Sequence, residues 1–266
     1  MSGTKWGGAT TRAALRVPAV TAMFWVIKGL STALGESTSD WAVHAMPPVL
    51  AVLIGFVCFV AALAVQFSKR RYVPWAYWLT VVMVGIFGTM AADVLHVAFH
   101  VPYVASALLY GVALTAVFVT WHRVEGTLSV HEIDTPRREA FYWAAVVTTF
   151  ALGTAVGDLT AITLNLGYLA SAVLYATLIA VIALAYRRGH LGPTLAFWAA
   201  YVMTRPLGAS IADWLAKPTT EGGIGVGAGT TSLVLAAVIA VLVAAISRPS
   251  HDVAATRRGE RGAHAV

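Results

Sequence analysis

The sequence predicts an all-α membrane protein with eight spans, built from four repeats of a helical hairpin. Its 266 residues are 59% hydrophobic and only 11% charged, with a mean hydropathy of +0.76. Soluble domains carry roughly 25% charged residues. Apolar runs long enough to cross a bilayer recur along the whole chain, so we expect no separate soluble domain.

Eight apolar segments are expected to form the spans. Their expected bounds are 18–46, 48–67, 74–100, 103–121, 139–164, 168–186, 193–216 and 228–246. Taken in pairs, they give hairpins at about 18–67, 74–121, 139–186 and 193–246. The membrane domain is then 18–246, with a tail at 1–17 and another at 247–266. The first tail has no apolar core followed by a cleavage site, so we expect no signal peptide.

The basic residues predict how the spans are oriented. Fifteen of the eighteen Lys and Arg lie in the two tails or in the connections that follow the second, fourth and sixth spans. Only Lys217 lies on the other side, and Lys28 and Arg205 lie within spans. The positive-inside rule therefore places both termini in the cytoplasm. The net charge of +6 reflects this topology, and we expect no nucleic-acid partner.

A four-fold internal repeat underlies the hairpins. Each begins with an aromatic residue and a tryptophan, has a glycine ten residues after the tryptophan, and an aspartate five residues after the glycine. The tryptophans are Trp25, Trp78, Trp143 and Trp198, the glycines are Gly35, Gly88, Gly153 and Gly208, and the aspartates are Asp40, Asp93, Asp158 and Asp213. Each unit holds two spans, so all four enter the membrane in the same direction. The first helices of the hairpins could surround one interior or pack as two pairs.

These features resemble a bacterial membrane family of four tandem two-span repeats, each with a characteristic tryptophan, catalogued as a domain of unknown function. The most specific stretches are residues 28–40, Lys-x3-Thr-x2-Gly-Glu-x3-Asp, and residues 204–213, Thr-Arg-Pro-Leu-Gly-Ala-Ser-x2-Asp. The resemblance covers residues 24 to about 229 and implies eight spans and a bacterial cytoplasmic membrane. It implies no substrate.

The charged residues inside the spans are the candidate site. The four repeated aspartates lie five to nine residues before the turns, so we expect them in the outer half of the membrane, where acids usually serve function. The alternative is that they cap wet helix ends. Lys28 is expected to pair with an acid, either Glu36 or one from another span. Arg205 needs carboxylates, carbonyls or water, and Pro206 is expected to kink its helix. Both cations could equally be structural.

Histidines near two of the aspartates suggest a metal site. Asp93, His96 and His100 are spaced i, i+3, i+7, and Asp40 is followed by His44 one turn later. Such mixed nitrogen and oxygen ligands suit Zn²⁺, Mn²⁺ or Fe²⁺. Histidines at wet helix ends are the plainer interpretation, and haem held by these histidines is a third. No cofactor is predicted with certainty.

Other repeated features are expected to be architectural. The tryptophans fit an aromatic belt at the membrane surface, and the glycines fit close helix packing. Residues 221–229 are expected to form a flexible outer loop or a re-entrant segment. The connection 125–139 is expected to be a solvated cytoplasmic loop.

The leading functional hypothesis is a proton-coupled secondary transporter or exchanger of a small cation, with a divalent metal favoured. The four aspartates, Glu36, His96 and His100 would bind the ion, and Lys28 and Arg205 would supply counter-charges. The alternative is a non-transporting membrane sensor or assembly factor with structural salt bridges. We find no Walker loop, HExxH or GxSxG motif and predict no enzyme. Protein partners and oligomeric state are left open.

Overall fold

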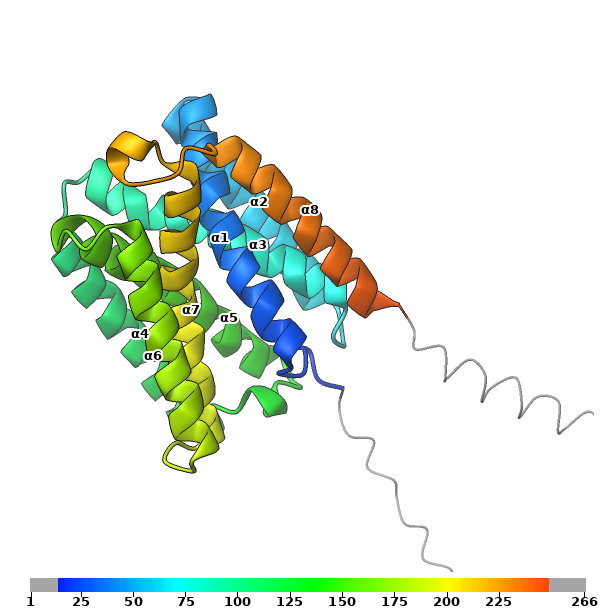
Figure 1. The fold of residues 1–266 in the computed structure, drawn as a ribbon. Coiled ribbons are helices and arrows are strands. Elements are labelled where there is room, and N and C mark those ends of the chain that lie inside the picture. Colours follow the sequence, from blue (N-terminus) through cyan, green and yellow to red (C-terminus); the bar gives the residue numbers. More distant parts are fainter. Residues whose placement is uncertain (1–13, 249–266) are drawn as a thin grey trace, which may run out of the picture.

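Residues 14–248 are described by the computed structural model, and they form an all-α fold, as predicted (Figure 1). The α-helices of this range are α1 (Ala22–Ala45), α2 (Pro48–Ser68), α3 (Pro74–Val97), α4 (Tyr103–Glu125), α5 (Pro136–Asp158), α6 (Tyr168–Arg187), α7 (Pro193–Ala216) and α8 (Ala228–Ser247). Short segments lie between them: 3-10 turns at Val130–Glu132 and Thr219–Glu221, and a π-helix at Leu159–Thr163. Most of both predicted tails lies outside the described residues.

Local sequence signals explain where the helices begin. Proline occupies the first turn of α2, α3, α5 and α7, where its missing N–H costs no hydrogen bond. Thr21 and Thr135 cap α1 and α5, because their hydroxyls accept a hydrogen bond from a backbone N–H of the first turn. Six of the described helices are long and apolar enough to cross a membrane; α1 and α7 are not among them.

Four helices form the centre of the molecule. The first helices of the hairpins, α1, α3, α5 and α7, pack in a closed circuit in which each contacts the next and α7 returns to α1. We call these four helices the inner bundle. The arrangement corresponds to a single shared interior and not to two separate pairs.

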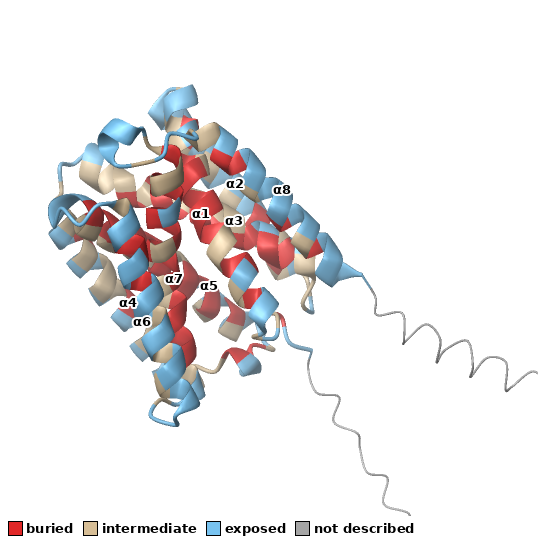
Figure 2. Cartoon of the chain, in the orientation of Figure 1, coloured by how far each residue is buried: buried red, intermediate tan, exposed pale blue. Residues whose placement is uncertain are grey.

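The second helix of each hairpin packs mainly on the first helix of the next hairpin. Thus α2 lies along α3, α4 along α5, α6 along α7, and α8 closes the circuit against α1. Figure 1 shows α8 beside α1 and α6 beside α7. Figure 2 shows the consequence: buried residues concentrate on the inner bundle, while the outward faces of α6 and α8 are exposed. Such apolar exposed faces are what a lipid environment would cover.

The repeated glycines form the closest contacts between inner helices. At every interface, a Cβ on the glycine would lie 3.0 Å or less from the neighbouring helix: Gly35 against Gly85, Gly88 against Phe150, Gly153 against Arg205, and Gly208 against Thr32. The contacted residue is always the one three positions before the glycine of the next repeat. One contact is therefore used four times around the circuit, which explains why the glycine recurs in the sequence.

The repeated tryptophans are also packing residues, which corrects their assignment to a membrane-surface belt. Three of them are at most 5% exposed, and each packs on the aromatic residue that precedes the tryptophan of the neighbouring repeat. The ring pairs are Phe24–Trp78, Tyr77–Trp143, Tyr142–Trp198 and Phe197–Trp25, with centroids 5.5–6.0 Å apart. The starts of the four inner helices thus gather at one end, which we call the tryptophan end. The opposite end, which carries the repeated aspartates, is the aspartate end.

The tryptophan end is covered by the segment before α1 and the connection between α4 and α5. Arg16 places its guanidinium against the fully buried carboxylate of Glu139, with 2.7 Å between Nη1 and Oε2. Gln66 donates a second hydrogen bond to Glu139 over 2.8 Å. Ile133 is fully buried, and its carbonyl accepts the Arg16 N–H. The expected solvated loop at 125–139 is therefore only partly correct: Val130, Ile133 and Glu139 are buried and close the end of the bundle, while residues such as Glu132 and Arg137 are exposed.

The glycine-rich segment at the aspartate end, expected to be a flexible outer loop or a re-entrant segment, is joined to the end of α7 by backbone hydrogen bonds. Four successive N–H groups, from Ile224 to Gly227, donate to the last carbonyls of the α7 end, residues 214–217. These are the carbonyls that a helix leaves without intrahelical partners. Positive φ angles of 80° and 88° at Gly225 and Gly227 permit this path.

Candidate functional site

The polar residues of the inner bundle occupy equivalent positions of the four repeats. Counting from each tryptophan, positions 3, 7, 11 and 15 are one helical turn apart and lie along one stripe of each inner helix. Position 7 holds Thr32, Gly85, Phe150 and Arg205, position 11 holds Glu36, Thr89, Thr154 and Ala209, and position 15 holds the four aspartates. Nearly every residue at positions 7 and 11 is buried, so the stripes face one another in the centre.

Arg205 contacts polar side chains of all three other inner helices. It is fully buried on α7, and its Nη2 donates to Glu36 Oε2 at 2.5 Å and to Thr154 Oγ1 at 2.8 Å. The same nitrogen contacts the hydroxyl of Thr89. One guanidinium therefore binds position 11 of the other three repeats, on α1, α3 and α5. The carboxylate supplies the charge that a permanently ionised, buried arginine requires.

The fourth repeat is built to make room for this arginine. Its own position 11 is Ala209, which leaves space where the other repeats place an acid or a threonine. Across the interface, Gly153 would bring a Cβ to 2.3 Å from Arg205 Cγ and 3.1 Å from the Pro206 ring. A side chain at Gly153 would thus displace the arginine stem. Pro206 lies within α7 as predicted and supplies no N–H of its own.

Lys28 does not pair with an acid, and that prediction is wrong. Its Nζ is fully buried, 4.3 Å from the ring centres of both Phe150 and Tyr201, and has no hydrogen-bond partner among residues 14–248. Glu36 lies two helical turns further along α1, about 12 Å at 1.5 Å per residue. Arg205 approaches Glu36 from the neighbouring helix and takes its carboxylate, which leaves Lys28 against aromatic faces.

The four aspartates, which we call the aspartate ring, lie one turn beyond Glu36. Asp158 and Asp213 are 9% and 6% exposed, whereas Asp40 and Asp93 are partly buried. Each aspartate lies near the end of its inner helix, and the four helices pack in a closed circuit. The structure therefore places the repeated acids around one end of the inner bundle.

A lysine that the site prediction left out completes one side of the ring. Lys217 Nζ lies 2.6 Å from Asp40 Oδ2 and 3.9 Å from Asp213 Oδ1. Partial burial by itself lowers the pKa of Lys217, but the two carboxylates outweigh it and raise the pKa above its ordinary range. Lys217 thus stays charged at any pH near neutrality.

The three candidate histidines lie at the aspartate end without converging on a common centre. His96 stacks on Tyr103 with ring centres 3.8 Å apart, and its Nδ1 is 3.0 Å from the carbonyl of Val101. His44 Nδ1 is 2.7 Å from the carbonyl of Asp40, and His100 is exposed in the turn after α3. Within residues 14–248, no three His, Cys, Asp or Glu side chains gather closely enough to hold a metal ion. A metal site in this part of the chain, whether it includes histidines or only the repeated aspartates, stays a prediction that no contact supports.

The helix geometry changes immediately after Asp158. The chain continues as a π-helix, Leu159–Thr163, in which backbone hydrogen bonds are rearranged. Tyr175 from α6 donates to the carbonyl of Val156 over 3.1 Å, and its hydroxyl lies 2.9 Å from that of Thr160. Single π-turns within α-helices occur frequently at functional sites. The acid of the third repeat therefore lies beside the least regular backbone of the inner bundle.

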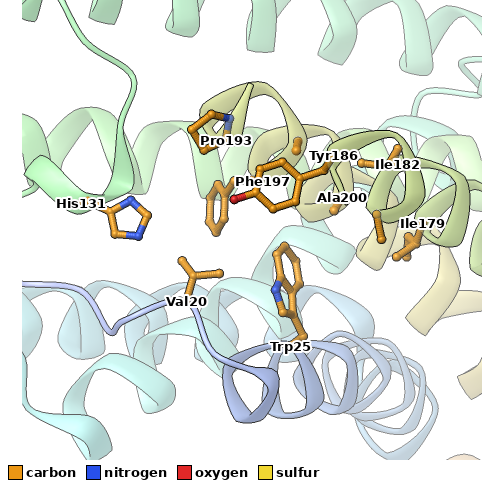
Figure 3. Close-up of a pocket in the computed structure, with 11 residues that line it drawn as sticks. Val20, Trp25, His131, Ile179, Ile182, Tyr186, Pro193, Phe197 and Ala200 are labelled. Atoms are coloured by element: carbon orange, nitrogen blue, oxygen red, sulfur yellow. The ribbon is translucent and has the colours of Figure 1, made fainter. Parts of the chain in front are cut away.

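A separate apolar cavity of about 390 Å³ lies at the tryptophan end. Figure 3 shows Val20 and Trp25 facing Phe197 and Tyr186 across it. Its lining has no acid, and it lies at the opposite end of the bundle from the aspartate ring. We therefore do not assign it to the charged site.

Several site residues were missed at the sequence level. Thr89 and Thr154 look like ordinary threonines, yet both bind Arg205. Aligning position 11 of the repeats with Glu36 would have selected them. Glu139 and Arg16 offered no such signal, because they lie outside the repeated frame and meet only through tertiary packing.

Comparison with known families agrees with this repeat structure. The model of the Repeat of Unknown Function (DUF347) matches four times, at residues 23–72, 76–127, 141–190 and 196–252. The chain belongs to the DUF347 family. Each DUF347 repeat corresponds to one inner helix and the helix that follows it, as the resemblance implied. The comparisons with curated proteins and with solved structures found no match. Membership of the DUF347 family identifies no substrate.

Proposed function

We propose that the protein is a multi-pass membrane transporter that exchanges a small cation, with a divalent metal ion favoured, for protons. One observation carries the proposal: an acid from every repeat lies at the same level of the inner bundle, one turn from the buried Glu36–Arg205 pair. Ionisable groups inside a membrane domain are costly and commonly mark ion or proton pathways.

In this proposal all eight helices cross the membrane, including α1 and α7. These two fall short in apolarity because they carry Lys28, Glu36 and Arg205, all of which face the protein interior and not lipid. Basic residues such as Arg137 and Arg187 lie at the tryptophan end, which would face the cytoplasm by the positive-inside rule. The aspartate ring would then open to the outside of a bacterial cytoplasmic membrane.

The two ends of the bundle differ in a way that suits an outward-open state. The tryptophan end is closed by closely packed aromatic rings and by the buried Arg16–Glu139 pair. The side chains of Asp40 and Lys217 keep 17% and 27% of their surface exposed at the other end. A cation could therefore reach the aspartate ring without passing the aromatic layer.

Exchange follows from the chemistry of the carboxylate. A carboxylate must lose its proton before it binds a metal ion, so binding at the aspartate ring would release protons. Glu36 is the proposed proton carrier. When Glu36 is protonated, Arg205 loses its counter-charge and must find another carboxylate. Lys28, one helical turn nearer the tryptophan end than Arg205, is the second buried cation whose contacts would change.

The alternative is that the buried charges only hold the bundle together. The observation that favours it is the reach of Arg205, which connects α7 to the other three inner helices. A sensor or assembly factor would need no ion to pass. We propose no enzymatic activity in either case.

Uptake of Mn²⁺ into proteoliposomes under an imposed pH gradient tests the proposal. We expect the parent protein to accumulate Mn²⁺, and Asp93→Asn and Asp158→Asn to lose most of that uptake. Asp134→Asn is the matched control, because Asp134 lies at the tryptophan end and pairs with Arg138. If both aspartate-ring variants match the parent, the transport proposal is wrong. If they lower thermal stability while uptake is absent from the parent as well, the structural alternative is supported.

A further inference from the structure

Lys217 is the only lysine or arginine in an ion pair with the aspartate ring within residues 14–248, and it pairs with two of the four acids. It bridges Asp40 on α1 and Asp213 on α7, which are neighbours in the circuit. Asp93 and Asp158, on α3 and α5, occupy the opposite side and form no ion pair in the described part of the chain. Acids that are equivalent in sequence are therefore unequal in structure.

The repeat explains this inequality. Lys217 lies nineteen residues after its tryptophan, and the same position is His44 in the first repeat, Val97 in the second and Ile162 in the third. Val97 and Ile162 cannot offer a positive charge to Asp93 or Asp158, and His44 places its Nδ1 2.7 Å from the carbonyl of Asp40. One side of the ring thus carries a built-in ammonium group, and the other side does not.

The surrounding backbone holds Lys217 in place. Its N–H donates to the carbonyl of Asp213 over 2.8 Å, and its carbonyl accepts from Gly225 over 2.9 Å. Gly223 packs so closely that a Cβ there would lie 2.0 Å from the Lys217 carbonyl oxygen. The glycine-rich segment therefore fixes the backbone from which the ammonium reaches the acids. A freely moving surface lysine would not need this support.

We propose that Lys217 is a tethered cation that occupies the Asp40–Asp213 side of the aspartate ring, competes there with the transported ion, and leaves Asp93 and Asp158 as the side that the ion enters. This inference rests on the proposed cation site, and it assigns Lys217 as the residue that limits how many cations the aspartate ring can bind. The ammonium of Lys217 also indicates the ligand that Asp40 and Asp213 accept: a small cation with hydrogen-bond donors or open coordination positions. Removing it opens a second place for such a cation.

Chemical rescue tests the proposal without any measurement of transport. The full chain is purified in detergent as the parent, Lys217→Ala, Lys217→Arg and Arg187→Ala, the last removing an exposed positive charge at the tryptophan end. Unfolding temperatures are measured against methylammonium chloride, with sodium chloride at the same ionic strength as the reference. We expect Lys217→Ala to lose about 3 °C and to regain most of it with methylammonium. The parent, Lys217→Arg and Arg187→Ala should show no specific response.

Binding of Mn²⁺ to the same proteins supplies the second readout. Because the tethered cation no longer competes, Lys217→Ala should bind Mn²⁺ at least about tenfold more tightly than the parent, a change equivalent to about 1.4 kcal/mol. Adding Asp40→Asn to Lys217→Ala should abolish both the rescue and the tighter binding. Equal Mn²⁺ affinity in the parent and Lys217→Ala, together with no methylammonium rescue, would overturn the role of Lys217. That result would leave the uptake experiment on Asp93 and Asp158 unaffected, so the two proposals fail separately.

Discussion

The Glu36–Arg205 pair gives the sharpest prediction about how the interior is stabilised. Glu36→Gln keeps an oxygen acceptor beside Arg205 but removes the charge that neutralises it. Arg205 is fully buried, so water cannot replace the lost carboxylate. Breaking one side of a buried ion pair costs about 3–5 kcal/mol. We expect Glu36→Gln to lose stability in that range.

The reverse variant is expected to cost less. Arg205→Met leaves Glu36 without its partner, but a carboxylate can take up a proton and become neutral, which an arginine cannot do. We expect a loss of about 2 kcal/mol, close to one charged hydrogen bond. The double variant leaves no buried charge in this layer and should cost no more than about 2 kcal/mol. The coupling energy is then at least about 3 kcal/mol, which is the upper end for residues in direct contact.

Helix content followed by circular dichroism during unfolding in mixed micelles measures these values. Glu132→Gln is the control, because Glu132 is an exposed acid at the tryptophan end and its replacement should change stability by less than about 0.5 kcal/mol. If the double variant costs the sum of the two single variants, Glu36 and Arg205 are not coupled. A loss below about 1 kcal/mol for Glu36→Gln would show that the buried pair contributes no more than an exposed ion pair does.

Three further predictions concern packing and the two ends of the bundle. Gly208→Ala should cost about 2 kcal/mol or more, because its Cβ would lie 1.9 Å from a hydroxyl of α1. Gly111→Ala, with nothing within 4 Å, should instead be neutral or stabilising by up to about 1 kcal/mol in the same unfolding assay. Glu139→Gln should cost about 3 kcal/mol because it breaks the buried Arg16–Glu139 pair. The control Arg137→Ala, at an exposed arginine, should cost less than about 0.5 kcal/mol. Similar losses for the two variants would show that the buried pair is dispensable. Because folding raises the pKa of Lys217, the contribution of Lys217 to the free energy of unfolding is complete below its unfolded pKa and is lost only as pH rises through the folded pKa. The difference in stability between the parent and Lys217→Ala should therefore be constant from about pH 6 to 9 and shrink in stronger base.

The repeat was the most informative feature of the sequence. Because tryptophan, glycine and aspartate recur at fixed spacing, the all-α hairpin architecture and the family could be predicted from them alone. The glycine was correctly expected to serve close packing, and the structure adds that each one contacts the next repeat. The tryptophan was misplaced, since a tryptophan at a helix start is equally compatible with a membrane surface and with a buried aromatic layer.

The partners of charged residues could not be predicted from sequence. Lys28 and Glu36 share one helix, which suggested a pair, whereas the geometry between helices gives Glu36 to Arg205. That choice depends on the lateral order of α1 and α7, which no spacing within one helix reveals. The role of Lys217 was missed for the same reason, because it reaches Asp40 only when α7 closes the circuit against α1.

Exchange of a cation for protons at the aspartate ring would change the pH inside proteoliposomes, which can be measured directly. A pH-sensitive dye trapped inside the vesicles reports proton movement when Mn²⁺ is added outside, with no pH gradient imposed at the start. If the aspartate ring exchanges Mn²⁺ for protons, Mn²⁺ entry makes the interior more alkaline with the parent protein, and Asp158→Asn abolishes the change. Mn²⁺ entry with no change in internal pH, or the same change with Asp158→Asn as with the parent, would rule out this exchange.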